Sequence, residues 1–152
     1  MPPVTTERDD LAEWGRYAFA RLRARLQGVS DEEYRCEPGP GVSSLAWRLG
    51  HIADLLADDR NATWLGVPRG AAPPHADDAA AAVAALEQAF ALWQSVLSAV
   101  PDHTLAEAIG SVGGPYADST RRAFVLHVLD ELVHHGAEVA LVRDLWAAQG
   151  RG

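Results

Sequence analysis

Four long segments of the chain repeat apolar residues at intervals of three and four, the spacing that places them on one face of a helix. They span about residues 6–27, 43–65, 77–100 and 118–149, and loop-forming residues, glycine and proline among them, lie between them. No segment reads as a strand. Amphipathic helices of this length bury their apolar faces against one another, so the sequence predicts an all-α fold with the architecture of a four-helix bundle.

Polar residues that begin helices stand at the starts of these segments. Ser43 or Ser44 is placed to cap the second helix, residues 77–78 start the third, and residues 118–120 cap the fourth. The chain has no internal repeat and no change of composition that would mark a domain boundary. Residues 1–152 are therefore expected to form one domain.

The composition narrows the class of partner. Asp and Glu number 21 against 13 Lys and Arg, which gives a formal net charge of −8. This acidic balance repels phosphate backbones and anionic headgroups, so neither nucleic acid nor a membrane is expected as a partner. The single cysteine excludes an internal disulfide. The N-terminus carries no signal segment and no run of about 18 apolar residues is present, so a cytoplasmic location is expected by elimination.

Histidine is the residue type that carries chemistry in this chain. Two of the six histidines lie in predicted loops, and the other four lie on the second and fourth helices. On the fourth helix, Glu131 and His135 are four residues apart and share one face. That face falls within the apolar stripe of Val128 and Val142, so both polar side chains are expected to point into the bundle and to need partners. A divalent cation is one such partner, and a simple hydrogen bond between the two side chains is the alternative.

His51 on the second helix is the candidate third ligand. Its neighbours Ile52 and Leu55 are apolar, and the alternative role for a histidine in that setting is a hydrogen-bonded core residue. Two imidazole nitrogens and one carboxylate oxygen form a known ligand set for zinc, and three protein ligands leave positions open for water or substrate. Zinc is the expected ion, with nickel, iron or manganese as alternatives.

Several other catalytic motifs are absent from the sequence. A di-iron carboxylate bundle needs carboxylates on all four helices and two Glu-x-x-His motifs, whereas this chain has one, from Glu131 to His134. The His-Glu-x-x-His motif of zinc proteases is also missing. A nucleophile elbow or a phosphate-binding glycine loop needs a preceding strand, and no strand is predicted.

Two segments of the chain resemble a known family. One is SLAWRLGHIADL at residues 44–55, and the other is RAFVLHVLDELVHHGAEVALVRDL at residues 122–145. Together with the order and spacing of the helices, they are similar to the DinB-like superfamily, which includes the N-terminal domain of mycothiol-dependent maleylpyruvate isomerases. The resemblance implies a four-helix bundle of DinB-like type with a metal held near one end. It also implies the ligands, one histidine on the second helix and two positions on the fourth, here His51, Glu131 and His135.

The same resemblance implies thiol chemistry. Several members resemble S-transferases or isomerases that use a low-molecular-weight thiol such as mycothiol or bacillithiol. A cationic metal lowers the pKa of a bound thiol, and the thiolate attacks a small-molecule electrophile. His134 or His127 is the candidate general base, and a supporting or surface role is the alternative for both. The resemblance also implies a homodimer.

Two other functions remain consistent with these residues. The bundle could bind a small molecule or a metal without turnover. Alternatively, its polar residues could serve only packing or dimerisation. A bound metal that is lost when Glu131 is replaced would distinguish a metal site from the purely structural role.

Overall fold

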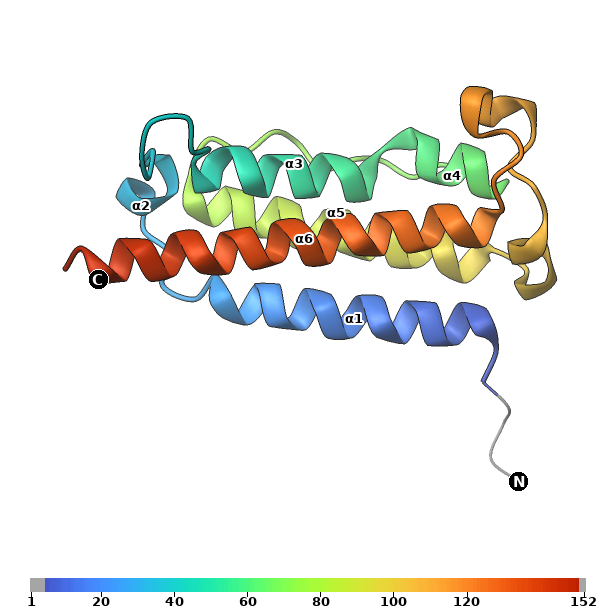
Figure 1. The fold of residues 1–152 in the computed structure, drawn as a ribbon, viewed down its shortest axis with the longest axis horizontal. Helices are drawn as coiled ribbons and strands as arrows, with labels where there is room; N and C mark the ends of the chain where they lie inside the picture. Colours follow the sequence, from blue (N-terminus) through green and yellow to red (C-terminus); the bar gives the residue numbers. More distant parts are fainter. Residues whose placement is uncertain (1–4, 151–152) are drawn as a thin grey trace.

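The computed structural model describes residues 5–150 of the chain. Within this range it contains helices and no strand (Figure 1). The predicted all-α fold is therefore confirmed. The α-helices are α1 (Glu7–Arg25), α2 (Asp31–Arg35), α3 (Leu45–Ala57), α4 (Asp59–Leu65), α5 (Ala79–Ala99) and α6 (Arg121–Ala148). Two short 3-10 helices, η1 (Asp102–Ala106) and η2 (Ser111–Tyr116), lie between α5 and α6.

Polar side chains cap the long helices at the predicted points. Of the two serines considered for the second helix, Ser44 is the cap, and its hydroxyl accepts a hydrogen bond from a first-turn backbone N–H at 3.2 Å. Asp78 and Thr120 cap α5 and α6 in the same way. At α1, Thr6 and Asp9 accept from each other's backbone N–H in a capping box. These bonds satisfy N–H groups that have no partner inside the helix, which defines where each helix begins.

The second predicted helix, residues 43–65, is in fact two helices. Asp58 separates α3 from α4, because its backbone is extended (φ −60°, ψ 129°) and its carboxylate caps α4. The carbonyls of Leu55 and Leu56 at the end of α3 accept hydrogen bonds at 2.9 and 3.2 Å from the buried side-chain amide of Asn61. Apolar periodicity misses this break because both helices face the same core. An aspartate that bonds locally to the backbone competes with the continuation of a helix.

The long helices form two parallel pairs, α1 with α6 and α3 with α5, and the two pairs are antiparallel to each other (Figure 1). Ion pairs join α1 to α6 near both ends, from Glu7 to Arg122 and from Arg25 to Asp144. Helices α3 and α5 can be parallel because residues 66–78 return along the bundle between the end of α4 and the start of α5. Helix α6 packs against both α1 and α3.

Helix α5 supplies much of the core. Ala82, Leu86, Phe90 and Trp93 are buried where α5 packs against α3 and α1. Among the described helices, α5 is the one that is long and apolar enough to cross a membrane, with a mean hydropathy of 1.3 in its most apolar window. Within that window 44% of the residues are buried inside the bundle, and this packing accounts for the apolar composition.

Arg143 of α6 connects α6 to α2 and to the end of α1, at the end of the bundle where α6 ends. Its guanidinium donates to both carboxylate oxygens of Glu33 on α2, at 2.7 and 3.1 Å. It also donates to the carbonyls of Arg25 and Gln27 at the end of α1, at 2.6 and 2.7 Å. Because the side chain of Glu33 is only 3% exposed, this contact is a buried ion pair with most of its hydrogen-bonding capacity satisfied.

Candidate metal centre

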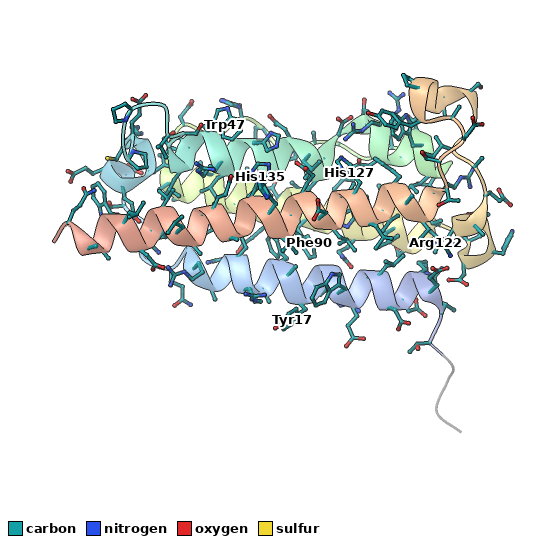
Figure 2. The ribbon with its side chains drawn as sticks, in the orientation of Figure 1. Tyr17, Trp47, Phe90, Arg122, His127 and His135 are labelled. Carbon is teal, nitrogen blue, oxygen red and sulfur yellow. The ribbon has the colours of Figure 1, made fainter. Side chains whose placement is uncertain are left out.

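The three predicted ligands meet across two antiparallel helices. His51 comes from the middle of α3, and Glu131 and His135 come from the middle of α6. The Nε2 atoms of His51 and His135 lie 3.8 and 3.3 Å from Oε2 of Glu131. The two imidazole rings are nearly perpendicular, with 4.5 Å between their centroids. Figure 2 shows His135 on the side of α6 that faces α3, where Trp47 lies.

The spacing of these atoms fits a divalent ion. Zinc bonds of about 2.0–2.2 Å in tetrahedral geometry separate neighbouring ligand atoms by about 3.4 Å. One ligand atom from each of His51, Glu131 and His135 lies within 4.8 Å of the other two, and the separations of 3.8 and 3.3 Å from Oε2 of Glu131 are close to the spacing of ligand atoms around zinc. Imidazole nitrogens suit zinc and other transition metals better than magnesium or calcium, which prefer oxygen ligands. Ligation by these residues stays a prediction.

The trio is open to solvent on one side. The side chain of His135 is 12% exposed, whereas those of Glu131 and His51 are 29% and 38% exposed. The indole of Trp47 stacks on the His51 ring, with 5.0 Å between centroids and 6° between the ring planes. Three protein ligands with one accessible side leave room for water or a small molecule next to an ion.

Glu138 and Arg48 form a second layer behind His135. Oε2 of Glu138 lies 2.8 Å from Nδ1 of His135, and Arg48 of α3 donates to the same oxygen. Burial raises the pKa of Glu138, but the hydrogen bond with His135 and the charge of Arg48 outweigh it, so the pKa is lowered from 4.5. Glu138 is therefore a carboxylate at neutral pH. Neither residue was assigned this role from the sequence, although Glu138 follows His135 by three positions and Arg48 precedes His51 by three, which places them near the ligand faces.

The two histidines predicted as general bases lie outside the trio. The side chain of His134 is 61% exposed, and its Nε2 lies 3.3 Å from Oε1 of Glu138. His127 is exposed and lies about 12 Å along α6 from His135, since eight residues separate them (Figure 2). A general base acts within hydrogen-bond distance of the proton that it takes, or through one water. A catalytic role for either histidine stays a prediction.

A groove of about 720 Å³ begins beside the trio. Trp47 and His51 belong to one of its walls, and residues 72–77 of the returning segment belong to another. Arg35 and Asp54 place opposite charges on its lining, and alanines of α3 and α5 supply apolar surface. This volume is in the range of small-molecule sites in proteins.

The fold and the family of the chain follow from its similarity to known proteins. The crystal structure of a conserved protein from Enterococcus faecalis matches with a TM-score of 0.74 and 18% identity, over 95% of this chain and 99% of that chain. This likeness shows the fold. No curated protein matches the chain. The model of the DinB superfamily matches residues 16–139, which include His51, Glu131 and His135. The chain therefore belongs to the DinB superfamily.

Proposed function

We propose that this chain is a metal-dependent enzyme that joins a low-molecular-weight thiol, such as mycothiol or bacillithiol, to a small electrophile. The observation that carries the proposal is the convergence of His51, Glu131 and His135, whose ligand atoms lie within 4.8 Å of one another. Membership of the DinB superfamily supports it, because the isomerases that the chain resembles use mycothiol. Zinc is the proposed ion.

The three candidate ligands and the open side of the trio each have a part in the proposed chemistry. A divalent ion held there would lower the pKa of a thiol and so supply a thiolate at neutral pH. His51, Glu131 and His135 would hold the ion, and the solvent-exposed side would admit the thiol. With an alkyl chloride as electrophile, an S–C bond forms as the C–Cl bond breaks. Chloride leaves with the bonding electrons, and the thiol proton passes to solvent or to His134.

The groove is the proposed site for the rest of the electrophile. Its wall shares His51 with the trio, so a molecule in the groove lies next to an ion held by that histidine. The indole of Trp47 is 52% exposed and offers a flat apolar surface at the same place. These features favour a small substrate with a planar or apolar part.

Binding without turnover is the second candidate function. The observation that favours it is the position of the two histidines proposed as bases. His134 is exposed and paired with Glu138, and His127 lies two helical turns before His135. In that case the metal and groove would bind a ligand without a group placed to move its proton.

The test measures metal content and conjugation in the same preparations. The purified protein would be analysed for metal by mass spectrometry and then mixed with monochlorobimane and either mycothiol or bacillithiol. Glu131→Gln removes one charged ligand while keeping its size. Glu13→Gln is the matched control, because Glu13 is an exposed carboxylate on α1.

We expect near-stoichiometric metal and fluorescent conjugate with the wild type and with Glu13→Gln, and neither with Glu131→Gln. Metal that is retained without conjugation of either thiol would reject the transferase and support the binding protein. A wild type that binds no zinc, nickel, iron or manganese would overturn the proposal.

A further inference from the structure

His135 is placed between two carboxylates, one at each ring nitrogen. Its Nδ1 lies 2.8 Å from Oε2 of Glu138, which is a hydrogen-bond distance, and its Nε2 lies 3.3 Å from Oε2 of Glu131. A neutral imidazole carries one N–H and one lone pair. The shorter contact places the proton on Nδ1, toward Glu138. The lone pair on Nε2 then faces Glu131 and His51, where a divalent cation would relieve the repulsion between electron pairs.

Glu138 is itself held in place from the opposite helix. Arg48 of α3 donates to the same carboxylate oxygen that contacts His135, and its side chain is only 11% exposed. The Nε of Arg48 donates in addition to the carbonyl of Ser43, at 3.3 Å, just before the start of α3. Arg48 therefore links the beginning of α3 to the carboxylate behind His135, and it restricts the directions that Glu138 can take.

The arrangement argues against a second ion at Glu138. His134, His135 and Glu138 also bring ligand atoms within 4.8 Å of one another. However, the guanidinium of Arg48 already donates to Oε2 of Glu138, and this positive charge would repel a cation bound at the same carboxylate. His134 is mostly exposed and pairs with the other oxygen at 3.3 Å. This cluster supports the first trio and does not form a second centre.

We propose that Glu138, held by Arg48, is a positioning residue that fixes His135 with its Nδ1 protonated and its Nε2 directed to a divalent ion shared with His51 and Glu131. The inference rests on the proposed metal site. A carboxylate behind a ligating histidine restricts the ring orientation and makes the ligand more basic, and its loss weakens metal affinity by about 10- to 100-fold.

The test compares Glu138→Ala, which removes the acceptor, with Glu138→Gln, which keeps an acceptor oxygen of the same reach. Glu87→Ala is the matched control, because it breaks an Arg–Glu pair between α1 and α5, two helices that contribute no residue to the trio. Zn²⁺ affinity is measured by competition with a chelator, and Co²⁺ binding is followed by its visible spectrum. The tautomer of His135 is read from ¹⁵N chemical shifts of the metal-free protein at a pH above the usual histidine pKa.

We expect the wild type and Glu87→Ala to bind Zn²⁺ equally, Glu138→Ala to bind about 10- to 100-fold more weakly, and Glu138→Gln to lose less. We also expect the Nδ1–H tautomer of His135 in the wild type and in Glu138→Gln, and its loss in Glu138→Ala. A Glu138→Ala variant with unchanged affinity and Co²⁺ spectrum would overturn the positioning role while leaving the proposed metal site intact. An Nε2–H tautomer in the wild type would overturn it regardless of metal binding. A wild type that binds neither ion would overturn the proposed function instead.

Discussion

Replacing Arg143 with methionine should destabilise the fold by about 3–5 kcal/mol, because it leaves a buried carboxylate without its partner. The side chain of Glu33 is 3% exposed, and Arg143 contacts both of its oxygens, at 2.7 and 3.1 Å. The same guanidinium donates to the carbonyls of Arg25 and Gln27, so the substitution also removes two hydrogen bonds at the end of α1.

Removing both charges should recover most of the stability that Arg143→Met loses. A buried ion pair and a pair of apolar side chains of similar volume differ little in stability, whereas one unpaired charge is costly. We therefore expect Glu33→Met combined with Arg143→Met to be clearly more stable than Arg143→Met alone. The assay is urea unfolding followed by far-UV circular dichroism. In a chain of this length, 3–5 kcal/mol corresponds to a fall in Tm of about 6–20 °C.

Arg122→Met is the matched control for this prediction. Arg122 forms an exposed pair with Glu7, with side chains 41% and 42% exposed, so its loss should change stability by less than about 1 kcal/mol. A similarly small loss for Arg143→Met would refute the reasoning. So would a double variant no more stable than the single one, because the cost would then not come from an unpaired charge.

Three further outcomes can be checked by unfolding experiments. Asn61→Ala should cost about 1–3 kcal/mol in urea unfolding, because the carbonyls of Leu55 and Leu56 lose their buried donor, and unchanged stability would contradict this. Gly50→Ala should stabilise by about 0.5–1 kcal/mol, since Gly50 lies inside α3 and an added Cβ meets no atom within 4 Å, and a lower Tm would count against it. Burial raises the pKa of Tyr34 above 10.0, so the folded chain holds the phenol proton more tightly than the unfolded chain does. The stability that this difference contributes is lost as pH rises through the folded pKa. Tyr34→Phe should therefore lose less stability above pH 10.0 than the wild type, and equal pH profiles would reject this contribution.

The helices could be predicted from the sequence because their signals are local. Apolar spacing and a capping side chain lie within a few residues of the structure that they determine, as at Ser44 and Thr120. The break at Asp58 has a local signal too, but it leaves the apolar spacing unchanged, so the pattern continues across it. The pair of Arg143 with Glu33 has no local signal at all, since it depends on how the end of α6 packs against α2.

The candidate site likewise combines a pairing that local spacing predicts with contacts that depend on how the helices pack. Glu131 and His135 share a helix face whatever the tertiary structure, so their pairing could be inferred from their spacing. His51 is a candidate from the sequence because it would complete a His-Glu-His ligand set, and its likeness to a family segment strengthens this prediction, because spacing alone cannot place α3 beside α6. The contact of Arg48 with Glu138 depends on the register of those two antiparallel helices. That register is set by the packing of the whole bundle and cannot be deduced from the sequence of either segment alone.

The site is built from helices that are far apart in the chain, and this affects how the protein folds. Arg48 and Glu138 are separated by 90 residues, and the trio joins the same two helices. Closing so long a loop has an entropic cost that must be met before the contacts between α3 and α6 form. A nascent chain or fragment without α6 would therefore have no assembled trio. An ion with affinity only for the assembled trio would stabilise the native state, by about 2.7 kcal/mol at 100 times its Kd, and would act on the last stage of folding and not on early collapse.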